Sequence, residues 1–247
     1  MVGPVPSRRA DRLPAALFAY SVALAVLLLV PPYLKASVGP PQAFTLQEAA
    51  DLVTSLVVIP LAWLAFDLAG GLGRRGLVAF LVVAALWVEG QGIHLAANAI
   101  GDAFPHDATE AFYRTVPGDL DLWIDETLSH WMWHAAWMGL SILMLAAATR
   151  GSVVPPDRTS VTAAAAGLIC GVTFFLVSVE GVTTLLGIPA SILILAWCAL
   201  AGRRGLTRQP VVTFFLVSTV VTLLGYVVWG ALNDCALPEF SKVGLFG

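Results

Sequence analysis

The chain has 247 residues, of which 58% are hydrophobic and only 12% charged, and its formal net charge is −3. A soluble globular domain carries about 25% charged residues, so this composition excludes a water-soluble fold of this length, and it also excludes a basic nucleic-acid-binding protein. The three cysteines form no Cys-x-x-Cys pair. We therefore expect neither a disulfide framework nor a thiolate metal site.

Seven apolar runs follow one another along the chain, each about the 20 residues that cross a hydrocarbon core. We predict membrane-spanning helices over 13–30, 52–68, 77–100 and 126–148, a fifth beginning near 161, a sixth ending near 201 and a seventh over 211–231. The first run is long for the apolar core of a signal peptide and no small-residue cleavage site follows it, so we expect it to be retained. The sequence thus predicts an all-α, seven-helix membrane domain over residues 1–247.

The basic residues between these runs predict an orientation. Ten of the 13 lysines and arginines fall on the side of the N-terminus, and three, Lys35, Arg114 and Lys242, fall on the other side. Because cytoplasmic loops are enriched in lysine and arginine, we expect the N-terminus inside and the C-terminus outside. The longest loop, about 101–125, is then outside and acidic. It would be a solvated cap or a vestibule that attracts cations.

A short repeat links the fifth and seventh spans. Residues Val172–Ser178 and Val212–Ser218 both read VTFFLVS. A parallel duplication and a biased apolar composition would each produce this identity. If the copies are equivalent, the fifth span reaches about Leu185, Glu180 lies inside the membrane, and the sixth span begins at Pro189.

Two of the predicted helices carry polar residues at helical spacing. The third span has Gln91, His94, Asn98 and Asp102, and the fourth has Glu126, His130 and His134. Residues three or four apart share one face of a helix, so each set forms a polar stripe. With a rise of 1.5 Å per residue, the three histidines lie about 6 to 12 Å below the outer ends of their helices. We therefore expect three imidazoles in one layer of the membrane.

Three imidazoles at matched depth predict a site for a divalent metal ion such as zinc, with His94, His130 and His134 as ligands. His-x-x-x-His places two ligands on adjacent turns, and three protein ligands leave a position for water. Polar side chains of membrane helices also bond simply to a neighbouring helix, which is the plain alternative for the same residues.

Carboxylates near this layer are candidates for proton transfer. A bound divalent ion would acidify a water molecule, and the sequence offers Glu126, Asp102 or Glu180 as the general base. Glu89 lies deeper, near the middle of the membrane and on a different face from His94. We expect it to bond between helices or to handle protons.

The segment Ser129–His134, which reads SHWMWH, and the following Gly139–Ser141 resemble the His-x-x-x-His helix of the alkaline ceramidase group. That group belongs to a superfamily of seven-helix membrane hydrolases that includes the progestin and adiponectin receptors. In that superfamily the paired histidines lie in the last helix, whereas three predicted spans follow them here.

The resemblance implies a zinc-dependent lipid hydrolase in which His94 and the paired histidines hold the metal. Asp102 would stand for the family's aspartate, and Gly90 occupies the position of the family's serine.

The first functional hypothesis is an intramembrane metal-dependent hydrolase that cleaves an amide or ester of a membrane lipid near the outer leaflet. The second is a b-type haem electron-transfer protein with His94 and either His130 or His134 as axial ligands. The third is a transporter or a structural membrane subunit, which the repeat and the acidic loop would suit. We expect the plasma membrane of a bacterium as its location and membrane lipid, not nucleic acid, as its partner. No oligomeric state is predicted.

Overall fold

The structure is a computed structural model that describes residues 8–38, 44–101, 106–150, 159–206 and 209–245. Its helices are α1 (Arg8–Leu29), η1 (Pro31–Tyr33), α2 (Leu46–Leu68), α3 (Gly73–Gly101), α4 (His106–Tyr113), α5 (Val116–Trp123), η2 (Ile124–Ser129), α6 (His130–Arg150), α7 (Thr159–Glu180), α8 (Thr184–Arg203) and α9 (Pro210–Leu232). Within the described ranges, seven helical runs are long and apolar enough to cross a membrane. The prediction of an all-α, seven-helix fold is confirmed.

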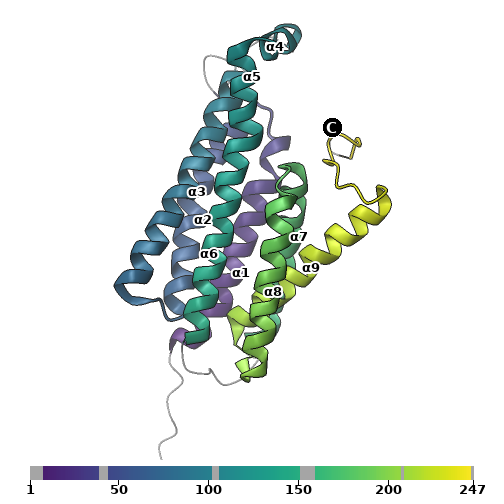
Figure 1. The fold of residues 1–247 in the computed structure, drawn as a ribbon. Coiled ribbons are helices and arrows are strands. Elements are labelled where there is room, and N and C mark those ends of the chain that lie inside the picture. The colour runs from purple at the N-terminus through teal and green to yellow at the C-terminus, as the bar shows by residue number, and fades with distance from the viewer. Residues whose placement is uncertain (1–7, 39–43, 102–105, 151–158, 207–208, 246–247) are drawn as a thin grey trace, which may run out of the picture.

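The seven long runs form one bundle (Figure 1). Helix α1 packs against α2 and α7, α3 packs against α6, and α7 packs against α9. The run that contains α5, η2 and α6 is the most enclosed. In its most apolar stretch 61% is buried inside the bundle, against 28% to 44% in the other six runs. A polar residue on α6 is therefore more often inside the bundle than one on the other spans.

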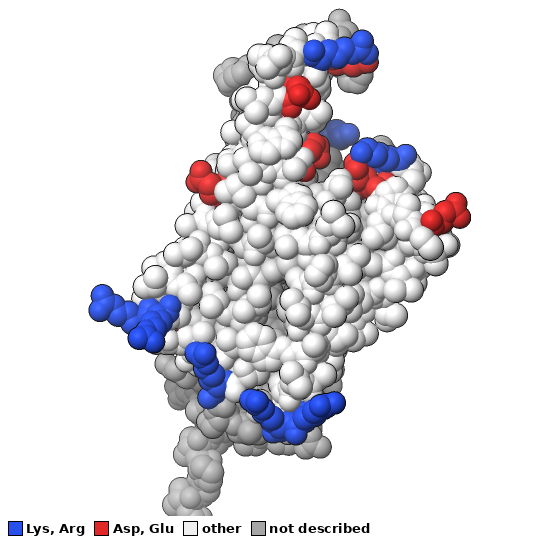
Figure 2. All heavy atoms as spheres, in the orientation of Figure 1, with Lys and Arg blue, Asp and Glu red and all other residues white. Residues whose placement is uncertain are grey.

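Charged side chains gather at the two ends of the bundle. Figure 2 shows lysine and arginine, without acidic side chains, at the end where α2 turns into α3 and α8 ends, whereas most aspartate and glutamate lie at the other end, beside α4, α5 and the C-terminal segment, together with a few lysine and arginine side chains. On this face a broad belt without charge lies between them. Such a belt is what a helical bundle presents to hydrocarbon. The protein is therefore an integral membrane protein.

The segment predicted as a long outer loop is largely helical. Helices α4 and α5 occupy most of 101–125, and α5 continues through η2 into α6, so the fourth span runs from Val116 to Arg150 without a break. A capping residue explains where it starts, because the Thr115 hydroxyl accepts a hydrogen bond from the Gly118 N–H and Pro117 suits the first turn.

The fifth span ends earlier than equivalence of the two VTFFLVS copies would require. Helix α7 stops at Glu180, and α8 begins at Thr184 with Pro189 inside it. The short turn between them includes Val182 at φ 51°, a left-handed backbone conformation that no helix continues. The fifth span therefore lacks the extension to Leu185 that equivalent copies would give, the sixth span begins at Thr184 rather than at Pro189, and Glu180 is the last residue of α7.

Glu89 lies near the middle of α3, on the face that points away from the other helices. It is 12 residues, about 18 Å, from the end of the helix at Gly101, and its side chain is exposed like that of Val88. It has no hydrogen-bond or ion-pair partner within the described ranges. A carboxylate on this face therefore meets lipid, at a cost on the order of 2 kcal/mol.

Glu89→Leu is expected to raise the unfolding temperature in lipid nanodiscs by about 4 to 8 °C, because it removes that cost. The matched control is Val88→Leu, which changes an exposed neighbour without changing charge. Thermal unfolding followed by circular dichroism measures both variants. A loss of stability in Glu89→Leu would mean that the carboxylate is bonded to something outside this chain.

Candidate functional site

A polar cavity of about 350 Å³ lies at the acidic end of the bundle, where the ends of α1, α2, α3, α6 and α7 meet. Its polar lining comprises Gln47, Asp51, Gln91, His94, Asn98, Asp125, Glu126, His130, Glu180, Glu239 and Ser241. Four of the six predicted site residues, His94, His130, Glu126 and Glu180, are therefore brought to one cavity. Asp102 lies outside the described residues, and His134 lies one turn deeper on α6.

Both ring nitrogens of His94 are engaged by neighbours of different chemistry. Nδ1 lies 2.6 Å from Oδ1 of Asp125, and Nε2 lies 3.1 Å from the Asn98 side-chain nitrogen. A carboxylate only accepts and an amide nitrogen only donates, so His94 donates from Nδ1 and keeps its lone pair on Nε2. A carboxylate commonly fixes this tautomer in histidines that bind metal ions.

The π-helix η2 determines which carboxylate reaches His94. An α-helix places residues four apart on one face, and on that basis Glu126 shares a stripe with His130. A π-helix bonds residues five apart, so Asp125 takes the place above His130. Asp125 is buried whereas Glu126 is exposed at the cavity. Sequence reasoning missed Asp125 because one extra residue in the turn shifts the register.

A glycine lets the two histidine helices approach closely. A Cβ atom on Gly90 would lie 2.9 Å from the backbone nitrogen of Trp133 and 3.0 Å from the carbonyl oxygen of Ser129. Real Cβ atoms rarely come this close to backbone atoms, so no larger residue fits without separating α3 from α6. One turn above, the rings of His94 and His130 have their centroids 5.0 Å apart.

Two imidazole nitrogens on α6 are buried without a hydrogen-bond partner in the described part of the chain, His130 Nδ1 and His134 Nε2. His130 packs against the backbone of Gly181. His134 is fully buried, its Nδ1 lies 2.9 Å from Oγ1 of Thr183, and its ring stacks on Trp133. A buried nitrogen without a partner costs free energy, and of these two residues only His130 lines the cavity, where a group that the chain does not itself supply could reach it.

Asp51 and Gln91 are polar residues of the cavity that sequence reasoning did not assign to the site. Asp51 is 7% exposed and Gln91 5% exposed, and the Gln91 carbonyl oxygen has no partner within the described ranges. The sequence signal that could have placed Asp51 inside a helix was the capping box just before it. Thr45 and Glu48, whose carboxylate accepts from the Thr45 N–H at 2.5 Å, start α2 at Leu46. This start places Asp51 inside the helix rather than before it.

Glu180 binds the C-terminal segment to the wall of the cavity. Its Oε2 accepts hydrogen bonds from the backbone N–H groups of Phe240 and Ser241, at 2.9 and 3.3 Å, and so fixes the C-terminal segment beside the cavity. On that segment the Lys242 ammonium donates to Glu239 at 2.5 Å. The hydrogen bond and charge of Glu239 raise the pKa of Lys242. The predicted role of Glu180 in proton transfer stays a prediction.

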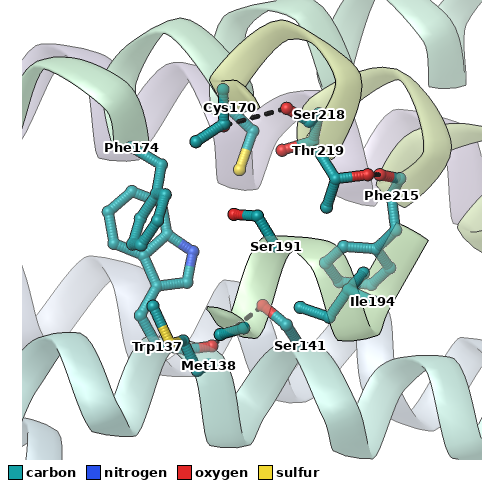
Figure 3. Close-up of a pocket in the computed structure, with 12 residues that line it drawn as sticks. Trp137, Met138, Ser141, Cys170, Phe174, Ser191, Ile194, Phe215, Ser218 and Thr219 are labelled. Carbon is teal, nitrogen blue, oxygen red and sulfur yellow. Dashed lines mark hydrogen bonds between the residues drawn. The ribbon is translucent and has the colours of Figure 1, made fainter. Parts of the chain in front are cut away.

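A second cavity lies deeper, between α6, α7, α8 and α9 (Figure 3). Its volume of about 30 Å³ is enough for one or two water molecules. Hydroxyl groups line it, and Ser191 points into it. No imidazole or carboxylate lines it, and Cys170 is the one ionisable side chain among the residues that do.

Within the described residues, no three histidine, cysteine, aspartate or glutamate side chains converge closely enough to hold a metal ion as they stand. Comparisons with family models, with curated proteins and with solved structures found no match. The resemblance to the alkaline ceramidase group stays a prediction, and the polar cavity is the feature of the molecule that bears on function.

Proposed function

We propose that the protein is an intramembrane metal-dependent hydrolase whose active site is the polar cavity. The observation that carries the proposal is the pair of imidazoles from His94 and His130, 5.0 Å apart between ring centroids and backed by Asp125. Two imidazoles that share one zinc ion, each with a Zn–N distance of about 2.1 Å, have ring centroids roughly 5 Å apart.

Two imidazoles of the cavity fit a divalent ion, because His94 Nε2 carries a lone pair that only the Asn98 amide now uses and His130 Nδ1 has no partner in the described part of the chain. His94 and His130 would hold it, and either His134, whose Nε2 has no partner in the described chain, or Asp51 would complete the ligand set. When bound, such an ion supplies the Lewis acidity that activates water at neutral pH.

The other side chains of the cavity have separable tasks. Asp125 accepts from His94 Nδ1 and so orients the ring. Glu126 lines the cavity and bonds to no other side chain in the described ranges, which leaves its carboxylate able to accept a proton from an attacking water molecule. Glu239 and Ser241 of the C-terminal segment, which Glu180 holds in place, form one wall of the cavity.

The spacing of the rings favours a small ion over haem. Axial imidazoles bind opposite faces of a haem, so their rings lie on a line through the iron and further apart than two ligands at a tetrahedral angle. The 5.0 Å between His94 and His130 suits the latter arrangement. Haem ligation by these two residues would require the helices to separate at Gly90.

The substrate that this position suits is a membrane lipid with an amide or ester bond. The cavity lies at the end of the bundle opposite the arginine-rich end. By the positive-inside rule, the N-terminus is inside and the cavity faces the outer leaflet of the plasma membrane, which we take to be bacterial.

The test is hydrolysis of lipid amides and esters by the purified protein in nanodiscs, before and after treatment with a chelator. We expect hydrolysis to stop on chelation and to return with zinc, manganese or another divalent ion. Hydrolysis that a chelator leaves unchanged would refute the metal. Stoichiometric metal without cleavage of any substrate in the panel would refute the hydrolase.

Asp125→Asn is expected to weaken metal binding by 10- to 100-fold, since it removes the charge that orients His94 while preserving the shape of the side chain. Competition against a chelating dye measures the affinity. Asp119→Asn, at an exposed carboxylate on α5, is the control and should bind metal like the unaltered protein. Equal affinities in the two variants would show that Asp125 does not act on a metal ligand.

A further inference from the structure

An apolar groove of about 580 Å³ lies on the outside of the bundle between the ends of α1 and α7. Leu28, Leu29, Leu176 and Val177 line its length, and Lys35 lies at its rim. Its volume falls in the range of about 300 to 1,000 Å³ that small-molecule sites occupy. Because the groove faces the lipid phase, an alkyl chain is the group that its lining suits.

The groove and the polar cavity adjoin each other. Leu28, Pro32, Val177, Glu180 and Ser241 line both of them. A lipid whose chain lies in the groove would therefore direct its polar end past Val177 towards His94 and His130. This geometry gives a lipid a lateral path from the membrane into the cavity, without passage through water.

The charges along this path discriminate between headgroups. Two of the five carboxylates that line the cavity have a cationic partner, Asp125 with His94 and Glu239 with Lys242. The other three, Asp51, Glu126 and Glu180, have no cationic side chain within 4.0 Å in the described part of the chain. A divalent ion would balance two of these charges, which leaves the cavity still favourable to a cationic group.

The rim of the groove has the opposite charge. Lys35 is exposed there, and no carboxylate pairs with it within the described ranges. A lysine ammonium beside an apolar groove suits a lipid phosphate as a point charge. The groove thus contributes a cation, and the adjoining cavity contributes an excess of carboxylates.

We infer that the groove and cavity form one binding site for a zwitterionic membrane lipid whose headgroup carries a phosphate followed by an ammonium group. The phosphate lies near Lys35, the ammonium group lies among Asp51, Glu126 and Glu180, and the chain lies between α1 and α7. That this lipid is also the substrate rests on the proposed function, whereas its binding does not.

The test is binding of short-chain, ether-linked lipids, which cannot be hydrolysed, to the full chain in detergent by isothermal titration calorimetry. Phosphatidylethanolamine has the ammonium group, and phosphatidylglycerol has the same phosphate without it. We expect the ethanolamine lipid to bind at least tenfold more tightly. We expect Lys35→Ala to weaken both lipids severalfold, whereas Lys242→Ala changes neither by as much.

Val177→Trp places a large side chain where the groove meets the cavity and is expected to weaken binding of the ethanolamine lipid at least tenfold. Leu193→Trp, on a residue of α8 that is 70% exposed, is the matched control and should bind normally. Gel filtration and circular dichroism establish that both variants fold. If Val177→Trp does not fold, Val177→Phe with the two lipids gives the same comparison.

Equal binding of the two lipids, or equal binding by Val177→Trp and Leu193→Trp, would overturn the inference. Selective binding without hydrolysis of the ester-linked lipid would leave the inference standing and remove the proposed function. Metal-dependent hydrolysis of a lipid amide or ester without headgroup selectivity would overturn the inference and leave the proposed function standing.

Discussion

His130→Ala is expected to lower kcat/KM for lipid hydrolysis by a factor on the order of 10³ or more, which corresponds to about 4 kcal/mol of transition-state stabilisation. The reason is its central place in the histidine cluster. Its ring centroid lies 5.0 Å from that of His94 and 6.3 Å from that of His134. Its replacement therefore removes the ligand that lies between the other two histidines. Steady-state hydrolysis in nanodiscs measures the effect.

Two further variants separate chemistry from folding in this experiment. Trp131→Leu changes the adjacent residue, which is 40% exposed and does not line the cavity, and should hydrolyse lipid normally. His130→Gln retains a polar side chain of similar size against Gly181 and should fold while remaining inactive. Near-normal activity in His130→Gln would contradict a ligand role for the imidazole.

Gly90→Ala is expected to destabilise the protein by about 1 to 3 kcal/mol and to reduce metal affinity, although it adds a single carbon atom. The new Cβ would lie 2.9 Å from the Trp133 backbone nitrogen and 3.0 Å from the Ser129 carbonyl oxygen, and backbone atoms cannot rotate aside. Helices α3 and α6 must then separate, and His94 must move away from His130.

Gly92→Ala is a closely matched control for this prediction. It lies two residues away on the same helix, and a Cβ atom there would have no neighbour within 4 Å. It should leave metal affinity unchanged and, through higher helix propensity, should stabilise by up to about 1 kcal/mol. Thermal unfolding and dye competition on both variants give the comparison. Equal behaviour of the two would show that the close approach at Gly90 does not position the histidines.

The seven spans could be predicted from the sequence because the bilayer fixes the length of each apolar run. The common depth of His94 and His130 was predicted by counting residues from the ends of the apolar runs, although the helical run that carries His130 begins at Val116 and not at the predicted Glu126. Both inferences use only spacing along one helix, and a helix has few ways to depart from its rise per residue.

The carboxylates could not be assigned in this way. The π-helix η2 exchanges Asp125 for Glu126 at the position facing His94, and no local rule for residue spacing identifies a π-turn in advance. Asp51 comes from a different helix, and Glu180 bonds to a segment 60 residues later in the chain. Each of these assignments depends on tertiary packing rather than on periodicity.

His134 illustrates the limit of a periodicity argument for a site. It shares a face of α6 with His130, as predicted, yet the next turn of the helix lies about 6 Å deeper. There Trp133 and Phe174 enclose the ring and Thr183 bonds its Nδ1. Packing, which the sequence pattern does not encode, separates the third histidine from the open cavity. Its part as a metal ligand stays a prediction.

The most direct test of the metal site is the metal content of the protein, purified in detergent without a metal-affinity tag and measured by mass spectrometry beside a visible spectrum. The account predicts about one equivalent of a divalent metal, no Soret band, and loss of the metal in both His94→Ala and His130→Ala. Absence of metal and colour, with both variants still folded and monodisperse, would contradict it and leave the imidazoles as hydrogen-bonding groups between helices. A Soret band would assign them to haem.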